Sequence, residues 1–308
     1  MSTRAESVPQ RTMLVTGGAG FIGSHLVDAL VARGLSVRAL DNLAAGRREN
    51  LNPRAEFVAA DIRHPESIAA AFAGVECVFH TAALPRVMLS IDDPLATHLT
   101  NVDGTLNVLI AARDAGVRQV IYSGSSSVYG DQATLPLIES MTPNPLNPYA
   151  LQKLVGEQYC RMFHRLFGLE TVALRYFNVY GPRMTSEGAY VTVLGVFMRA
   201  RREGRALPIH GDGEQTRDFT HVRDVVRANL AAMDTRVGQG RVLNVGSGRR
   251  ISVNRIAALF GGQTVHLPTR PAETRDTLAD LTEVKRVLGW TPEIDSEAGM
   301  RELIEATA

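Results

Sequence analysis

A tyrosine and a lysine spaced four residues apart are the strongest candidates for chemistry in this sequence. The motif YALQK at 149–153 places the Tyr149 phenol and the Lys153 ammonium on one face of a predicted helix, with Cβ atoms about 5–6 Å apart. Pro148 favours a helix start, so both side chains would lie in the first turns. A free tyrosine has a pKa of about 10, and a base working near pH 7 needs about three units less, roughly 4 kcal/mol. Because a neighbouring cation can supply part of that difference, the pair predicts a tyrosine general base.

A serine-rich turn offers hydroxyl groups to the same site. The run SGSSSVYG at 123–130 follows a strand-like segment. Hydroxyls at the carboxyl end of a parallel strand line the crevice in which ligands bind. Ser125 beside Tyr149 could therefore relay or stabilise a proton.

A glycine-rich turn near the start of the chain predicts a dinucleotide site. The motif TGGAGFIG at 16–23 lies between the first strand-like run and a helical pattern, where glycines allow a tight turn and close approach to a pyrophosphate. Asp41, 18 residues after Gly23, ends the second strand-like run and could accept hydrogen bonds from the adenosine ribose. A carboxylate there repels a 2′-phosphate, which favours NAD, although Arg47 and Arg48 nearby keep NADP as an alternative. The glycine turn and the other strand ends give the expected cofactor-binding residues Gly17, Gly20, Phe21, Ile22, Gly23, Asp41, Asn42, Asp61, Ile62 and Ala82.

Composition excludes several other classes of protein. The 308 residues are 45% hydrophobic and 21% charged, which is typical of a globular chain. The net charge of +1 predicts no nucleic-acid partner and no anionic membrane surface, and no apolar run approaches the ~20 residues of a membrane span. Two cysteines and a first ten residues without an apolar stretch indicate a reducing, cytoplasmic setting, with no disulfide framework and no metal site. Only two of the 33 cationic side chains are lysine, which draws attention to Lys153 because a guanidinium cannot replace an ammonium.

The elements that must position these residues alternate along the first two thirds of the chain. Strand-like runs at 13–16, 36–40, 56–59, 77–81, 119–123 and 171–175 alternate with helical patterns near 22–33, 65–73, 95–115 and 149–167. This alternation predicts an α/β fold, a Rossmann-like doubly wound parallel sheet covered on both faces. After about Phe177 the pattern becomes turn-rich, with one more strand at 242–245 and a helix at 253–260. We therefore expect an NAD-binding domain of residues 1–177 and 222–249, and a smaller, discontinuous substrate-binding region of residues 178–221 and 250–308.

Six segments together resemble the extended short-chain dehydrogenase/reductase family, and within it the nucleotide-sugar 4-epimerases. They are TGGAGFIGSH (16–25), SSSVYG (125–130), PYALQK (148–153), LRYFNVYGPR (174–183), GDGEQTRDFTHVRDV (211–225) and RPAETRDTLAD (270–280). The resemblance extends from about residue 12 to 290. It implies NAD as cofactor and a nucleotide-sugar, UDP-linked, as substrate.

The resemblance also implies a role for each matching residue. Tyr149 would be the base, Lys153 its partner and a ligand of the nicotinamide ribose, and Ser125 the hydroxyl that bridges sugar and tyrosine. By the same resemblance, the family's active-site asparagine is Asn101, which joins Lys153 in the cofactor-binding set. The expected substrate contacts are Ser125, Ser126, Tyr149, Asn178 near the diphosphate, Arg217 on the diphosphate, and Arg270 with Glu273 on the nucleoside ribose.

Two positions bear on the reaction and the substrate. Dehydratases of this family carry Asp and Glu after the serine, and decarboxylases carry Glu at the second position, whereas this chain has Ser126 and Ser127, which favours simple epimerisation. Thr277 stands where epimerases restricted to unsubstituted hexoses carry tyrosine, which suggests a UDP-GlcNAc/UDP-Glc type of enzyme. UDP-glucuronate 4-epimerase, an NDP-uronate decarboxylase and an NDP-sugar dehydratase stay open as alternatives. So does a non-catalytic NAD-binding module, although such a protein would be expected to have lost part of the Ser/Tyr/Lys set. By the same resemblance the helical segments 95–115 and 149–167 could pair with their copies in a homodimer.

Overall fold

A seven-stranded parallel sheet forms the centre of the molecule, and this confirms the expected fold class. The computed structural model describes residues 11–187, 191–269 and 274–307. The strand order is β11-β6-β5-β4-β1-β2-β3, and every neighbouring pair is parallel. The strands are β1 (Thr12–Thr16), β2 (Ser36–Asp41), β3 (Glu56–Ala59), β4 (Val75–His80), β5 (Gln119–Ser125), β6 (Glu170–Tyr176) and β11 (Arg241–Val245). Because the chain runs outward from β1 in one direction and then from β4 in the other, the order reverses between β1 and β4, where such sheets bind ligands.

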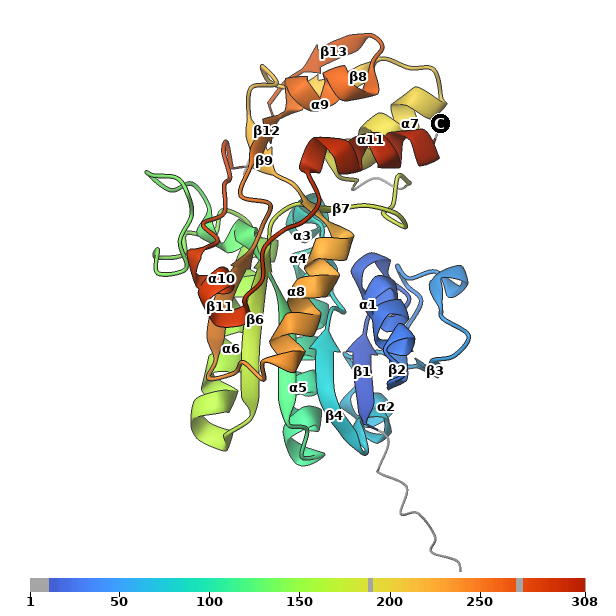
Figure 1. Ribbon diagram of the computed structural model, residues 1–308, viewed down its shortest axis with the longest axis vertical. Coiled ribbons are helices and arrows are strands. Elements are labelled where there is room, and N and C mark those ends of the chain that lie inside the picture. Colours follow the sequence, from blue (N-terminus) through green and yellow to red (C-terminus); the bar gives the residue numbers. More distant parts are fainter. Residues whose placement is uncertain (1–10, 188–190, 270–273, 308) are drawn as a thin grey trace, which may run out of the picture.

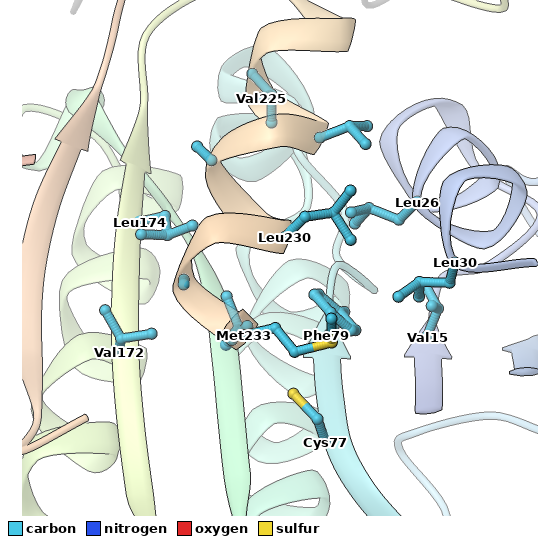
Figure 2. Packing of buried hydrophobic residues seen from close by; sticks show 14 of the residues in the cluster. Val15, Leu26, Leu30, Cys77, Phe79, Val172, Leu174, Val225, Leu230 and Met233 are labelled. Carbon is cyan, nitrogen blue, oxygen red and sulfur yellow. The ribbon is translucent and has the colours of Figure 1, made fainter. Parts of the chain in front are cut away.

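Helices cover both faces of the sheet because alternate residues of each strand point to opposite sides. In β1, Met13 and Val15 join the cluster under α1 (Phe21–Ala32), α8 (Val222–Asp234) and α10 (Thr282–Leu288), while Leu14 joins the opposite cluster. Figure 2 shows side chains of α8 packed between α1 and strands of the sheet. The opposite face is covered by α2 (Pro65–Ile68), η2 (Ala69–Phe72), α5 (Gly104–Asp114) and α6 (Pro148–Phe167).

Two of the expected helices differ from the prediction. The segment 65–73 forms one short α-helical turn followed by the 3₁₀ turn η2. The segment 95–115 divides into α4 (Pro94–His98), a widened π-helical turn η3 (Leu99–Asp103) and α5. Such widened turns occur often at functional sites. A further helix that the sequence did not indicate, α3 (Val87–Asp92), follows the loop after β4.

The C-terminal part forms a second layer beyond one end of the sheet (Figure 1). Its own hydrophobic cluster joins α7 (Val193–Arg202), β8 (Leu207–His210), α9 (Val253–Phe260) and α11 (Ser296–Ala306), and β8 pairs with β13 (Thr264–Leu267). Two further two-stranded pairings are short: β7 (Val179–Tyr180) with β10 (Thr220–His221), and β9 (Thr216–Asp218) with β12 (Arg250–Ser252).

Segments from late in the chain contribute to the hydrophobic cluster on one face of the sheet. Helix α8 packs on the sheet and β11 is one of its strands, although both come late in the chain. The α10 residues Val284 and Leu288 also pack in the sheet cluster, together with Trp290. Within the described ranges, no helix is long and apolar enough to cross a membrane.

Candidate active site

One large cleft lies between the carboxyl end of the sheet and the C-terminal layer. Its volume is about 1330 Å³, larger than the about 300–1,000 Å³ typical of a pocket for one small ligand. The cleft therefore has room for a cofactor and a substrate together. Sixteen of the expected site residues line it: Gly17, Gly20, Phe21, Ile22, Gly23, Asp41, Asn42, Asp61, Ile62, Ala82, Ser125, Ser126, Tyr149, Lys153, Asn178 and Arg217.

The glycine turn after β1 has the geometry of a phosphate cradle. Gly17 adopts φ +71°, which favours glycine, and a Cβ on Gly23 would lie 2.1 Å from the Gly17 carbonyl oxygen. The first intrahelical bond of α1 is made by Ser24 N to Gly20 O (3.1 Å), so the N–H groups of residues 21–23 precede it and point out of the helix end. The turn thus fits a pyrophosphate.

Asp41 at the end of β2 is buried and held by the same turn. Its carboxylate accepts hydrogen bonds from Ala19 N (3.0 Å) and Leu43 N (2.7 Å). Since a carboxylate has about four lone-pair positions, two bonds leave capacity for ribose hydroxyls. The residues present therefore fit an adenosine ribose without a 2′-phosphate.

A second carboxylate lies beside Asp41 at the same end of the cleft. Asp61 accepts a hydrogen bond from Asn42 Nδ2 (2.9 Å) and forms an ion pair with Arg63 (2.7 Å). Arg63 and Asn42 together hold the pKa of Asp61 well below its usual range, so it stays ionised. Ile62, the next residue, lines the cleft and packs against Gly104, where a Cβ would clash with it.

Tyr149 and Ser125 meet at the other end of the cleft. The Asn147 side chain caps α6 by accepting from Ala150 N (3.0 Å), which places Tyr149 in the first turn. Burial raises the pKa of Tyr149, while its hydrogen bond with Ser125 and the nearby Arg86 cation lower it. The Ser125 hydroxyl is itself oriented by Ser127 Oγ (2.8 Å). The phenol and a fixed hydroxyl thus face one point in the cleft.

Lys153 lies one turn further along α6 and is almost fully buried. Its Nζ donates to Ser123 O (3.0 Å) and lies 4.9 Å from the centre of the Tyr122 ring. Burial lowers the pKa of Lys153 to about 8, and the Glu157 carboxylate one turn later acts against that fall. With a pKa of about 8, Lys153 stays mostly protonated near pH 7 and can supply the positive charge expected beside Tyr149.

Asn101 lies behind the cleft wall. It is buried in the π-helical turn η3, where Oδ1 accepts from Leu84 N (2.8 Å) and Nδ2 donates to Leu84 O (3.2 Å) and Gln152 Oε1 (2.9 Å). It is not among the described residues that line the cleft. Its amide fixes the loop after β4 to helix α6.

The expected substrate residues lie on the opposite wall. Asn178 Nδ2 donates to Asp218 O (3.2 Å), and Arg217 reaches the carbonyls of Thr216 (3.0 Å) and Arg275 (2.8 Å). The buried Asp218 carboxylate accepts from the backbone N–H groups of residues 247, 248 and 279, and so ties this wall together. The expected Arg270 and Glu273 lie outside the described residues.

Several residues of the site had no role assigned from the sequence. Arg86 lines the cleft next to Tyr149. The buried Glu157 carboxylate pairs with Arg175 (2.8 Å), and Arg175 stacks on the Tyr129 ring (4.5 Å). The sequence signals for Arg86 were its place in the loop that follows a strand ending in small residues, and the resemblance of the segment LPRVMLSIDDP (84–94) to UDP-GlcNAc 4-epimerases.

Fold and site together fit an NAD-dependent enzyme, and comparison with known proteins agrees. The model of the NAD dependent epimerase/dehydratase family matches residues 13–246. A putative UDP-glucose 4-epimerase of Methanocaldococcus jannaschii is 39% identical over 300 residues, covering 95% of this chain and 97% of that protein. The chain therefore belongs to the NAD-dependent epimerase/dehydratase family, and its cofactor is NAD.

Two solved structures extend the comparison. The UDP-glucose 4-epimerase of Thermotoga maritima, solved with UDP-glucose, is 38% identical with a TM-score of 0.92, over 96% of this chain and 97% of that chain. The UDP-N-acetylglucosamine 4-epimerase of Methanobrevibacter ruminantium, in complex with UDP-N-acetylmuramic acid, is 35% identical with a TM-score of 0.90, over 97% and 98%. The similarity thus covers both the sheet domain and the C-terminal layer.

Proposed function

We propose that this protein is an NAD-dependent 4-epimerase of a UDP-sugar, of the UDP-GlcNAc/UDP-Glc type. The observation that carries the proposal is the pairing of the Tyr149 phenol with the Ser125 hydroxyl in a cleft that also holds Lys153 and a dinucleotide turn. Nucleotide-sugar epimerases with 38% and 35% identity share the fold over nearly the whole chain.

The chain's own residues would divide the work as follows. When bound, NAD supplies reversible hydride transfer at C4 of the sugar. Tyr149 takes the proton of the 4-hydroxyl group, Ser125 holds that oxygen, and the ring becomes a 4-keto sugar. Arg217 and Asn178 would hold the diphosphate, so that the ring can turn about its linkage and present its other face. Tyr149 then returns the proton to the 4-oxygen.

The serine turn supports epimerisation over elimination. Ser126 and Ser127 follow Ser125, and the Ser127 hydroxyl is hydrogen-bonded to Ser125 Oγ (2.8 Å). Neither serine is an acid or base suited to removing water or carbon dioxide from the ketone. A dehydratase or a decarboxylase would therefore lack its second proton-transfer group at this position.

The opposite wall supports a substrate with a substituent at C2. Thr277 lines the cleft, is buried, and is fixed by Asp218 N donating to its Oγ1 (3.3 Å). A small side chain leaves space where a tyrosine would fill it. We infer that an acetamido group as well as a hydroxyl can be accommodated.

The experiment is to incubate the purified protein, without added NAD, with UDP-GlcNAc, UDP-Glc and UDP-GlcA, and to resolve the products by NMR. Conversion of a sugar to its 4-epimer is the expected result, and a Tyr149→Phe variant should show none. Loss of water or carbon dioxide would refute epimerisation. Failure to convert any of the three would refute the proposed function.

We further propose a homodimer formed through α4 and α6. Large apolar side chains are exposed along these neighbouring helices and the adjoining turn η3, namely Leu95, Leu99, Leu151, Met162, Leu166 and Phe167. An exposed apolar surface of this extent is typical of an interface between subunits. Sedimentation should therefore give a dimer, and a Leu166→Glu variant should give monomers.

We also propose a cytoplasmic setting for the protein. It is supported by Cys77 and Cys160, which are both buried and form no disulfide.

A further inference from the structure

His80 at the end of β4 belongs to a chain of buried hydrogen bonds behind the wall of the cleft. Its Nδ1 lies 2.7 Å from Thr16 Oγ1 on β1, and its Nε2 lies 3.0 Å from Thr105 Oγ1 on α5. The Thr105 hydroxyl donates to Asn101 O (2.7 Å), and Ala82 N donates to Thr16 Oγ1 (3.4 Å). Thr16, His80 and Thr105 are buried, and in the described part of the chain they lie outside the lining of the cleft. The chain therefore supports the site without forming its surface.

The donors and acceptors of this chain can be assigned from one end to the other. A carbonyl only accepts, so the single hydroxyl proton of Thr105 is used on Asn101 O. Thr105 Oγ1 must then accept from His80, which places the ring proton on Nε2. In a neutral ring Nδ1 is then the acceptor, so Thr16 donates its hydroxyl proton to it. Every bond of the chain thus points the same way, from Ala82 N through His80 to Asn101 O.

The surroundings of His80 keep its ring neutral. Burial lowers the pKa of His80 to about 3, and the nearby Lys153 cation adds to the fall. The Tyr122 ring is close to both groups, because its centre lies 5.7 Å from that of His80 and 4.9 Å from Lys153 Nζ. A second ring proton, on Nδ1, would also take away the acceptor of the Thr16 hydroxyl. The hydrogen-bond geometry and the burial therefore require the same protonation state.

One end of the chain holds the dinucleotide turn against the loop after β4. Thr16 is the last residue of β1 and directly precedes Gly17. A Cβ on Gly17 would lie 2.8 Å from Ala82 N, so the turn and the loop are in close contact. Thr81 Oγ1 adds a hydrogen bond to Thr16 O (2.7 Å). Because Gly17, Thr81 and Ala82 all line the cleft, Thr16 fixes two walls of the NAD site to each other.

The other end of the chain reaches helix α6. Thr105 holds the carbonyl of Asn101, and the Asn101 amide donates to Gln152 Oε1 (2.9 Å). Gln152 is buried and directly precedes Lys153 in α6. A buried path of hydrogen bonds therefore runs from the dinucleotide turn to the helix of the proposed base, with His80 at its centre.

We propose that His80, as a neutral ring protonated at Nε2, is a positioning residue that couples NAD binding to the placement of helix α6. A buried polar network whose members are all satisfied rigidifies the groups that it joins. Breaking one link should therefore loosen the dinucleotide and misplace the base relative to it. The effect on turnover rests on the proposed 4-epimerase function, whereas the effect on dinucleotide binding rests on the NAD cofactor alone.

The first test determines the protonation of the His80 ring directly. Holoenzyme with isotopically labelled histidine nitrogens is studied by NMR near pH 7, and the His80 signals are assigned by their loss in a His80→Phe or a His80→Gln variant. We expect a protonated Nε2 and an unprotonated Nδ1. A ring protonated at Nδ1, or at both nitrogens, would overturn the proposal.

The second test breaks the chain on either side of His80. Thr16→Val and Thr105→Val each replace a hydroxyl by a methyl group of similar size, and are made singly and together. The rate at which bound NAD is replaced by excess NADH, followed by NADH fluorescence, should rise by about two- to tenfold in each single variant, as expected for one lost hydrogen bond. Because one broken link already uncouples the chain, the double variant should exchange no faster than the faster single one. Thr171→Val is the matched control, since Thr171 is equally buried but donates to Cys160 O (2.7 Å), and should exchange at the wild-type rate.

The two readouts separate the role of His80 from the proposed function. Wild-type exchange in Thr105→Val would refute the coupling, because Thr105 is joined to the dinucleotide turn through His80. Fold-changes that multiply in the double variant would refute it as well, since independent contacts add in free energy. Turnover per bound NAD should fall in the same variants, and faster exchange with wild-type turnover would contradict the link to α6. Absence of epimerisation in every form of the protein, with the exchange rates as expected, would instead refute the proposed function and leave the role of His80 in NAD binding standing.

Discussion

The burial of Lys153 predicts a measurable conflict between stability and catalysis. The fall of its pKa from 10.5 to about 8 corresponds to about 3 kcal/mol, since one pKa unit is about 1.4 kcal/mol. In the unfolded chain the lysine regains its ordinary pKa. Between pH 8 and 10.5 the unfolded state therefore binds more protons than the folded state, and stability contributed by Lys153 rises with pH. Below pH 8 the buried ammonium carries its full cost.

The perturbation is Lys153→Met, which removes the titrating group and retains an unbranched side chain. We expect the unfolding free energy of NAD-free wild type, relative to the variant, to rise by about 2–3 kcal/mol between pH 7 and pH 10. Near pH 7 the variant should be no less stable than wild type, although Ser123 O loses its donor, which costs about 1–3 kcal/mol. Its epimerase activity should be lost.

Urea denaturation followed by circular dichroism at several pH values measures this difference. The chain's only other lysine, Lys285, is exposed on α10, and Lys285→Met is the matched control. Its difference from wild type should be the same at every pH. A pH-independent difference for Lys153→Met, or one that falls as the pH rises, would refute the assignment of a desolvated ammonium at this position.

Three further predictions follow from single contacts. Lys153→Arg keeps a charge but misplaces it, and should lower turnover by at least about a hundredfold, within the range for a positioned proton-transfer site; near wild-type turnover would contradict the role of the ammonium. Gly23→Ala should yield folded protein without bound dinucleotide, measured as absorbance at 260 nm, because its Cβ would lie 2.1 Å from Gly17 O; retained dinucleotide would show that the turn can open. Glu157→Gln leaves the Arg175 guanidinium unpaired and should lower the unfolding free energy by about 3–5 kcal/mol. The double variant with Arg175→Met should recover much of the lost free energy. Equal losses in the single and double variants would contradict the role of this ion pair.

The sequence predicted the parts of the site whose geometry depends on local spacing. Tyr149 and Lys153 share a face because residues four apart on a helix do so, and Asn147 and Pro148 fix where that helix begins. The turn from Gly17 to Gly23 is likewise set by residues next to one another in the chain. The alternation of strands and helices was sufficient to predict the α/β class and the parallel sheet.

Long-range contacts determined the rest. Arg86 lies beside Tyr149 because Ser90 Oγ binds the Tyr149 N–H 59 residues away, and no local pattern encodes that pairing. Asn101 contacts Leu84 and Gln152 from η3, a π-helical turn that is one residue wider than an α-helical turn and lies in a segment whose periodicity indicated a single continuous helix.

The central claim is that one Tyr149/Lys153 site oxidises and reduces C4 of the same sugar without releasing the hydride. The direct measurement is to incubate the protein, without added NAD, with a UDP-sugar deuterated at C4 in ordinary water, and to follow C4 by NMR. The account predicts that the 4-epimer forms with its deuterium retained at C4. Epimer that has lost its deuterium to solvent would contradict the account.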